Sequence, residues 1–248
     1  MLTQERHKEI LDLLNKKSVV TVSELSEMFE TSESTIRRDL ALLDKQKKLN
    51  KIFGGAQAIR QVSGALENEV SIRENVMRPQ KDKIARYAAK LINDDDFVFI
   101  DSGTTTSMMI DYIGPTKATF VTNGIAHSLK LLRKGLNAYL IGGRIKPVTE
   151  AVVGAEGVNS LSGYNFTKAF LGANGIDLNA GFTTPDLEEA HIKRTAANNS
   201  YVSFVLADSS KFRKTTPITF ANLNKCCIIT DKAPGNDWSD ITAIKVVE

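Results

Sequence analysis

The chain has 248 residues, of which 42% are hydrophobic and 25% are charged, the proportions of an ordinary globular protein. This length allows one large domain or two modest ones, each with a buried core. No basic-then-apolar leader opens the chain, and no apolar run approaches the roughly 20 residues of a membrane helix. A membrane-spanning protein is therefore excluded, and we expect a cytoplasmic protein with no membrane partner. The neighbouring Cys226 and Cys227 lie in an apolar run, as expected of buried strand residues in a reducing compartment.

The net charge of +3 is unevenly distributed along the chain. Between Ser34 and Arg60, seven lysines and arginines stand against two acids, whereas the remainder has a slight excess of acids. A local positive patch of this kind is what a nucleic-acid contact surface requires.

Three amphipathic helices are expected near the N-terminus. Apolar residues at helical spacing predict them over residues 2–17, 23–29 and 33–43, with Ser23 as the cap of the second. The third has an apolar inner face and an outer face of small, polar and cationic residues. Two short helices joined by a tight turn, the second with a cationic front, predict a helix-turn-helix.

A β-hairpin wing is expected directly after these helices. Residues 48–59 contain two short strand-like pieces about Gly54 and Gly55, which tolerate positive φ. Residues 1–57 are therefore predicted to be a winged helix-turn-helix domain that binds double-stranded operator DNA.

The predicted DNA contacts lie on the outer face of the third helix and along the wing. They are Ser34, Thr35, Arg37, Arg38, Lys48, Lys51 and Gly54. The alternative is a solvated basic helix whose arginines pair with Glu33 or Asp39.

A second domain is expected after a linker. Residues 58–80 mix glycine, serine, charges and a proline without a sustained apolar period, which predicts a linker with room for a short helix at its end. Beyond it, short apolar runs such as FVFI (97–100) alternate with helical segments. This alternation predicts a doubly wound α/β domain over residues 81–248.

The main candidate binding site in this domain is the loop from Asp101 to Thr106, with the sequence DSGTTT. Gly103 lets the backbone approach a ligand, the hydroxyl groups offer donors, and the following helix N-terminus favours an anion, so we expect a phosphate cradle. The loop lacks the lysine and the spacing of a Walker P-loop, and ATP hydrolysis is not implied. The alternative is an ordinary helix cap.

Polar residues that follow other strands are expected to converge on this loop, where they would bind sugar hydroxyls and, through Lys211, the phosphate. The complete predicted effector-binding set is Asp101, Ser102, Gly103, Thr104, Thr105, Thr106, Asn123, Gly142, Gly143, Asn174, Asp177, Asp208 and Lys211. The alternative for each companion of the loop is an ordinary turn residue or a solvated side chain. The three histidines lack metal-ligand spacing, and no metal or cofactor is predicted.

Two groups of residues match a known family signature. Arg6, Ile10 and Leu14, followed after a gap by TIRRDL at 35–40 and a Gly-Gly-Ala wing, make the chain similar to the DeoR-type winged-helix repressors. The segments at 172–194 and 205–212 resemble that family's sensor domain, which is related to sugar-phosphate isomerase folds, and are closest to its fructose-operon repressor branch. The resemblance implies that the DSGTTT loop holds the phosphate of an effector, which is fructose 1-phosphate in that branch. This sequence departs from the family at Phe53, where a histidine is usual, and at Arg213, where a glycine is expected.

These observations predict a two-domain transcriptional repressor of sugar uptake or catabolism genes. Ser34, Thr35, Arg37 and Arg38 would enter the major groove, and a phosphorylated sugar in the second domain would lower operator affinity. One winged helix reads only a short site, so we expect a homo-oligomer, either a dimer or a tetramer.

Two alternatives remain open at this point. One is a sugar-phosphate isomerase-like enzyme with a DNA-binding appendage, in which Glu188, Glu189 and Lys193 lie in the segment that resembles a catalytic region. We favour a different interpretation of that segment, an exposed helical face on which Glu189 pairs with Lys193 at i, i+4. The other alternative is an architectural DNA-binding protein with an inert second domain.

Overall fold

The computed structural model describes residues 2–17, 19–58, 70–235, 238 and 241–248, and the chain divides into two compact units, Met1–Gln61 and Val62–Glu248. Of the predicted linker, residues 59–69 lie outside the described part, and its described end belongs to the second unit. Within the described residues, no helix is both long enough and apolar enough to cross a membrane.

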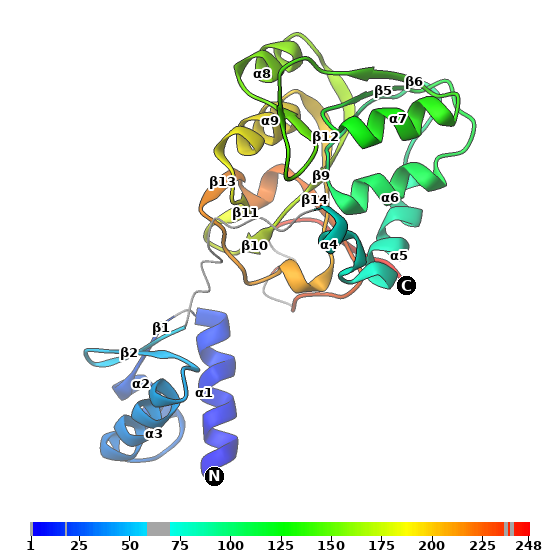
Figure 1. The fold of residues 1–248 in the computed structure, drawn as a ribbon. Coiled ribbons are helices and arrows are strands. Elements are labelled where there is room, and N and C mark those ends of the chain that lie inside the picture. The colour runs from blue at the N-terminus through cyan, green and yellow to red at the C-terminus, as the bar shows by residue number, and fades with distance from the viewer. Residues whose placement is uncertain (1, 18, 59–69, 236–237, 239–240) are drawn as a thin grey trace. The chain divides into compact units, whose positions relative to one another are not determined.

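The first unit is the predicted winged helix-turn-helix (Figure 1). Its elements are α1 (Thr3–Lys17), β1 (Val19–Thr21), α2 (Val22–Met28), α3 (Glu33–Lys45), β2 (Asn50–Ile52) and β3 (Gly55–Gln57). The strands form an antiparallel sheet in the order β1-β3-β2, in which β2 and β3 are the wing. The fold-class prediction for this unit is confirmed. The predicted Ser23 cap is wrong, because α2 begins one residue earlier and the Thr21 hydroxyl accepts the Glu24 N–H at 3.1 Å.

The recognition helix α3 is fixed by both its cap and its core face. The Ser32 hydroxyl accepts the Thr35 N–H at 3.3 Å, which satisfies one free donor of the first turn. Ile36, Leu40 and Leu43 are buried at the i, i+4, i+7 spacing expected from the sequence. Because these residues face the core, the opposite face of the helix is exposed to solvent.

The second unit is built on a seven-stranded sheet in which every pairing among the described residues is parallel. Its strands in spatial order are β15 (Ile244–Val246), β14 (Cys227–Thr230), β12 (Ser200–Leu206), β9 (Phe166–Gly172), β4 (Phe97–Ile100), β5 (Thr119–Thr122) and β6 (Asn137–Leu140). From β4 the chain first proceeds outward through β5 and β6, and later returns to the other side of β4 with β9. The strand order therefore reverses between β4 and β9, where doubly wound sheets bind ligands.

Helices cover both faces of this sheet, which confirms the predicted doubly wound α/β architecture (Figure 1). On one face lie α5 (Arg78–Ala89), α6 (Thr104–Tyr112) and α7 (Ile125–Arg133), and on the other α8 (Ala155–Ser162) and α9 (Leu187–Asn198). The strand side chains alternate accordingly: Val98 and Ile100 pack in the cluster that contains α5 to α7, while Phe99 packs in the cluster that contains α8 and α9.

Short elements outside the main sheet complete the second unit. They are α4 (Val70–Asn75), the hairpin β7 (Arg144–Lys146) and β8 (Ala151–Val153), the small sheet β10 (Gly175–Asp177), β11 (Gly181–Thr184) and β13 (Ile218–Ala221), and the 3₁₀ turns η1 (Ser209–Lys211) and η2 (Leu223–Lys225). Several of these elements lie around the carboxyl ends of the parallel strands, and they supply walls for a pocket there.

Candidate functional site: a basic winged helix and a strand-end pocket

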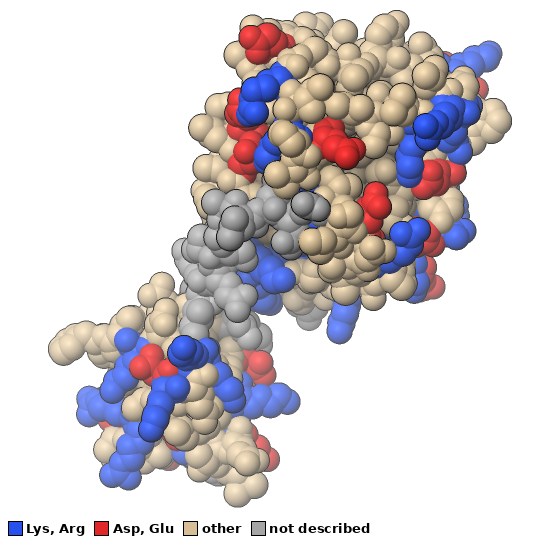
Figure 2. All heavy atoms as spheres, viewed as in Figure 1, with Lys and Arg blue, Asp and Glu red and all other residues tan. Residues whose placement is uncertain are grey.

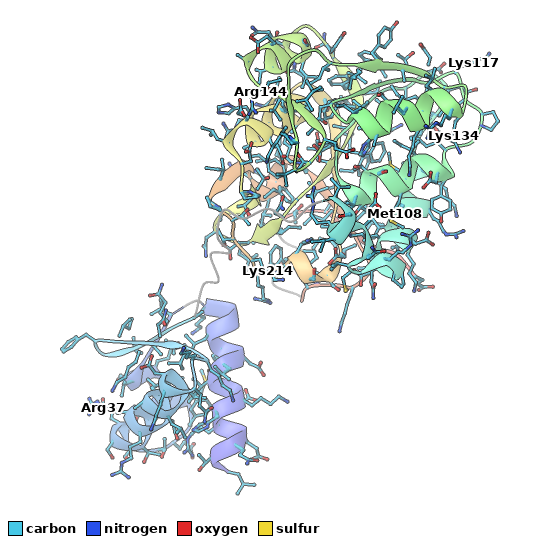
Figure 3. All side chains as sticks on the ribbon, viewed as in Figure 1. Arg37, Met108, Lys117, Lys134, Arg144 and Lys214 are labelled. Atoms are coloured by element: carbon cyan, nitrogen blue, oxygen red, sulfur yellow. The ribbon has the colours of Figure 1, made fainter. Side chains whose placement is uncertain are left out.

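The outward face of α3 and the wing carry the predicted DNA contacts. Lysines and arginines gather on the visible face of the first unit (Figure 2). Ser34, Arg37, Arg38, Lys48, Lys51 and Gly54 are exposed, and Thr35 is half-buried. Arg37 points outward from α3 (Figure 3).

The ion pairs of this unit leave that face available. Arg37 contacts Glu33 at 2.6 Å, but both side chains are largely exposed, and such an i, i+4 pair contributes only about 0.3–0.5 kcal/mol. Arg38 forms no ion pair with any residue that the structure describes. The alternative in which the arginines pair with Asp39 is wrong, because Asp39 is buried and faces inward.

Asp39 instead joins α3 to α1. Its carboxylate accepts the Arg6 guanidinium at 2.6 Å and lies 2.8 Å from His7 Nε2. Burial pushes the pKa of Asp39 upward, but the hydrogen bonds from Arg6 and His7 outweigh it and hold that pKa below its usual value. Asp39 therefore stays charged and fixes the orientation of the recognition helix.

The second unit contains a pocket of about 290 Å³ at the carboxyl ends of β4 and β9, the point where the strand order reverses. We call it the strand-end pocket. It is lined by the loop after β4, by Gly172 at the end of β9 and Asn174 beyond it, and by residues from α4, α5, α9 and η1. Its volume suits one small metabolite.

The DSGTTT loop presents the open N-terminus of α6 to this pocket. Gly103 is the N-cap and makes no side-chain hydrogen bond to the first turn. A Cβ at Gly103 would lie 3.2 Å from Thr106 Oγ1, so a side chain there would crowd the Thr106 hydroxyl. Free N–H donors at a helix N-terminus, together with the helix dipole, favour an anion.

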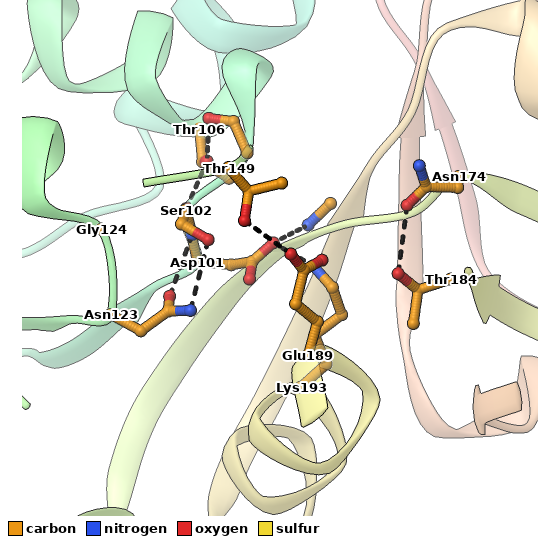
Figure 4. Close-up of polar contacts among 12 residues, drawn as sticks. Asp101, Ser102, Thr106, Asn123, Gly124, Thr149, Asn174, Thr184, Glu189 and Lys193 are labelled. Carbon is orange, nitrogen blue, oxygen red and sulfur yellow. Dashed lines mark hydrogen bonds and ion pairs between the residues drawn. The ribbon is translucent and has the colours of Figure 1, made fainter. Parts of the chain in front are cut away.

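Asn123, His127 and Thr106 of the loop itself hold the loop in shape. Asn123 Oδ1 accepts the Ser102 N–H at 3.0 Å, and its Nδ2 donates to Ser102 Oγ at 3.2 Å (Figure 4). Thr106 Oγ1 is fully buried, within hydrogen-bonding distance of the Asp101 and Gly103 carbonyl oxygens. His127 Nε2 lies 3.0 Å from the Gly103 carbonyl oxygen, and burial lowers the pKa of His127 to about 4. The imidazole is therefore neutral at physiological pH.

The strand-end pocket is positively charged. Five cations and three carboxylates line it: Arg73, Lys81, Lys193, Lys211 and Lys214 against Asp101, Glu189 and Asp208. An excess of cations in a cleft attracts an anionic ligand.

Two buried lysines connect the loop to distant helices. Lys193 of α9 forms an ion pair with Asp101, and both side chains are almost completely buried (Figure 4). Lys81 of α5 donates to Thr104 Oγ1 at 3.0 Å and to the carbonyl oxygen of Arg73 in α4. Burial lowers the pKa of Lys81 to about 8, and burial also lowers the pKa of Lys211. Burial therefore disfavours the charged form of both lysines, and an anionic ligand would stabilise that form.

The interpretation of residues 188–193 as an exposed helical face is wrong. Glu189 and Lys193 are buried, and the inner face of α9 turns toward the strand ends. Glu189 accepts Lys146 Nζ at 3.0 Å and the Thr149 hydroxyl at 2.8 Å, whereas Lys193 pairs with Asp101. Long-range packing of α9 against the sheet thus replaces the local i, i+4 pair.

The structure brings most of the predicted effector residues into the strand-end pocket. Asp101, Ser102, Gly103, Thr104, Thr105, Asn174, Asp208 and Lys211 line it. Thr106, the last residue of the loop, and Asn123 do not line the pocket but support the loop through hydrogen bonds.

Gly142, Gly143 and Asp177 do not line the strand-end pocket. The two glycines lie between β6 and β7. The Asp177 carboxylate accepts the backbone N–H groups of Asn179 and Ala180 at 2.9 and 3.0 Å, so it is an ordinary turn residue.

Several pocket residues were not predicted from the sequence. Arg73, Lys81, Thr149, Lys214 and Thr216 all line the pocket, and none lies in a recognisable local motif. Thr216 Oγ1 is buried and has no hydrogen-bond partner among the described residues. Because a buried hydroxyl without a partner is costly, this group is suited to meet a polar ligand.

Comparisons with known proteins agree with both units. A model of the DeoR-like helix-turn-helix domain matches residues 6–62, and a model of the DeoR C terminal sensor domain matches residues 74–232. The chain is 39% identical over 252 residues to the uncharacterized HTH-type transcriptional regulator FruR of Bacillus subtilis (strain 168), which covers 100% of both chains. It is 35% identical over 230 residues to the lactose phosphotransferase system repressor of Staphylococcus aureus (strain N315), which covers 91% of this chain and 90% of that one. Among solved structures, ribose 5-phosphate isomerase A from Methanocaldococcus jannaschii aligns at 16% identity and a TM-score of 0.41 over 54% of each chain, a likeness too slight to support an argument.

Proposed function

This chain belongs to the DeoR family of HTH-type transcriptional regulators, and from that premise we propose that it represses sugar uptake or catabolism genes under the control of a phosphorylated sugar. The observation that carries the proposal is the strand-end pocket, which places an open helix N-terminus among five cations in the unit that matches the sensor model. That arrangement suits a phosphate group joined to a hydroxyl-rich body.

Within the pocket, the phosphate lies against the loop from Ser102 to Thr105, where Lys81 and Lys211 neutralise its charge. Asn174, Asp208 and Thr216 meet the sugar hydroxyls, because amide, carboxylate and hydroxyl groups match them as donors and acceptors. Thr106 and Asn123 keep the loop in shape. We leave Gly142, Gly143 and Asp177 out of the binding set.

Fructose 1-phosphate is the effector that we propose to test first. The relative named FruR is 39% identical to this chain over its full length, while the lactose phosphotransferase system repressor shows that similar chains serve more than one sugar system. The choice of sugar therefore depends on the pocket side chains that contact the hydroxyls.

Operator binding is assigned to the outward face of α3 and to the wing. Ser34, Thr35, Arg37 and Arg38 enter the major groove, while Lys48, Lys51 and Gly54 contact the phosphate backbone. The protein acts in the cytoplasm as a homo-oligomer, because one winged helix contacts too few base pairs for a specific site. The phosphosugar lowers operator affinity by binding more tightly to the arrangement that does not hold DNA.

The isomerase-like alternative finds little support in the geometry. Glu188 forms an exposed ion pair with Arg144, and the Glu189 carboxylate is occupied by Lys146 and Thr149. Neither carboxylate is therefore a free base positioned to take a proton from a sugar.

The test is to incubate the full chain with fructose, ribose, glucose and glucosamine phosphates and to follow both thermal stability and turnover. A sensor is stabilised by one of them, releases a promoter fragment from its own operon, and converts none. Turnover, or a complete lack of binding across the panel, would contradict the proposal. The Thr105→Glu variant is the matched control, because a carboxylate in the loop repels phosphate.

A further inference from the structure

The tip of the wing carries a phenylalanine that the family assignment does not explain. Phe53 lies between β2 and β3, and its side chain has a relative exposure of 107%, the highest among the exposed large hydrophobic residues. Single exposed apolar side chains are common on protein surfaces, so exposure alone assigns no role. The surroundings of Phe53 supply the remaining argument.

The wing holds this ring on an anchored hairpin. The Gly54 carbonyl oxygen accepts the Val22 N–H at 2.8 Å, and the Lys51 N–H donates to Asp44 Oδ1 at 2.9 Å. A Cβ at Gly55 would lie 2.1 Å from the Val20 carbonyl oxygen, so the hairpin packs backbone to backbone on β1. Gly54 has φ +78° and permits the tight turn. Figure 1 shows the hairpin projecting beyond the helices of its unit. The hairpin backbone is therefore fixed before binding, and it presents the phenyl ring outward.

The charges of the wing indicate a polyanionic partner. Lys51 is exposed on β2, two residues before Phe53, and Lys47 and Lys48 are exposed in the turn that leads into β2, whereas the Asp44 carboxylate is engaged by the Lys51 N–H. An apolar protein surface gains little from such a cationic rim, whereas duplex DNA gains a phosphate contact from each lysine. The phenyl ring has no hydrogen-bonding group, so it cannot donate to a phosphate or read the donor pattern of a base edge. On a duplex it can pack on the C5-methyl group of a thymine or on the face of a base at an opened step, and only the second contact unstacks the bases.

We propose that Phe53 is a minor-groove wedge, which inserts partly between two base pairs beside the major-groove site of α3. This inference rests on the proposed operator binding and adds a specificity element to it. A wedge reads the ease with which a step unstacks, so the protein favours a flexible pyrimidine–purine step, such as TA or CA, at the wing position. Insertion also bends the DNA away from the wing.

The test compares the full-length protein with Phe53→Ala on a footprinted promoter fragment that carries either TA or a stiff A-tract at the wing position. The wild type binds the TA fragment about tenfold or more tightly than the variant, because the variant loses burial of the ring. On the A-tract fragment the two proteins differ little. A 2-aminopurine at the step brightens with the wild type alone, and energy transfer between the DNA ends reports the bend.

Two control variants separate failure of the wedge from failure of the proposed function. Leu2→Ala removes another exposed apolar side chain of the same unit and should leave DNA binding unchanged. Arg37→Ala should weaken binding to both fragments. If wild type and Phe53→Ala show equal DNA affinity, 2-aminopurine fluorescence and DNA bending, the wedge is overturned. A loss of DNA affinity in Arg37→Ala would then still support the proposed operator binding. A Phe53→Ala variant that changes self-association without DNA, but not DNA binding, would assign the ring to a second copy and overturn the wedge as well. Equal thermal stability of all variants confirms that each is folded.

Discussion

Phosphosugar binding should take up a proton at Lys81, and this coupling makes the affinity depend on pH. Burial lowers the pKa of Lys81 to about 8 in the free protein, although the Asp208 carboxylate opposes that shift. A bound phosphate favours the charged ammonium and raises the pKa again. Below pH 8 the ammonium is already charged. Above pH 8 the ligand must first draw a proton onto Lys81, so its affinity falls.

The size of the effect follows from the fraction of charged Lys81. That fraction falls from about 0.9 at pH 7 to about 0.1 at pH 9, which weakens binding about tenfold, or about 1.4 kcal/mol. The phosphate monoester does not contribute, because its second pKa lies near 6 and it is doubly charged throughout this range. The lowered pKa of Lys211 acts in the same direction.

Isothermal titration calorimetry with fructose 1-phosphate measures both the loss of affinity and the proton uptake. Affinities at pH 7 and pH 9 give the loss, and titrations at pH 8 in buffers of different ionisation enthalpy give the number of protons taken up. Lys81→Met should bind weakly at pH 7 with a flatter pH dependence, and Lys81→Arg should keep its charge through pH 9. Equal affinity at the two pH values, with no proton uptake at pH 8, would refute the placement of Lys81 beside the phosphate.

Three further substitutions test separate parts of the account. Arg37→Ala should weaken operator binding by about 1–3 kcal/mol, measured by fluorescence anisotropy, and leave phosphosugar binding unchanged. The substitution should not disturb the fold, because the lost ion pair with Glu33 is exposed and weak. Thr105→Glu should do the reverse in the same two assays, and equal damage to both activities would disprove two separate sites. Lys193→Met should lower the free energy of unfolding by about 3–5 kcal/mol in urea, because it leaves the buried Asp101 carboxylate unpaired. The double variant Lys193→Met with Asp101→Asn should recover much of that stability. If Lys193→Met alone were as stable as the wild type, the ion pair would not be buried.

Features encoded by local spacing were predictable from the sequence. The apolar positions of α3, the Gly54–Gly55 turn and the short run at 97–100 each identify an element through period or turn chemistry alone. The DSGTTT loop was predictable for the same reason, because a small polar stretch between a buried strand and a helix is a local signal.

The rest of the pocket depends on packing between distant segments. Lys193 meets Asp101 across 92 positions of sequence, and Lys81 reaches Thr104 from a different helix. A lysine on an amphipathic helix looks solvated in the sequence, since nothing local shows that its face turns toward the strand ends. Asp177 is the converse case: a polar residue at a strand end fits a ligand site and a turn equally well, and only its bonds to the backbone N–H groups distinguish them.

The claim that one protein couples a pocket to a DNA-binding face is tested most directly by measuring that coupling from both sides. Operator affinity is determined at fixed salt with and without saturating fructose 1-phosphate, and phosphosugar affinity with and without saturating operator. We expect each ligand to weaken the binding of the other by the same factor, of about tenfold or more, because binding linkage is reciprocal. Unchanged affinities in both directions, with both ligands shown to bind, would contradict it.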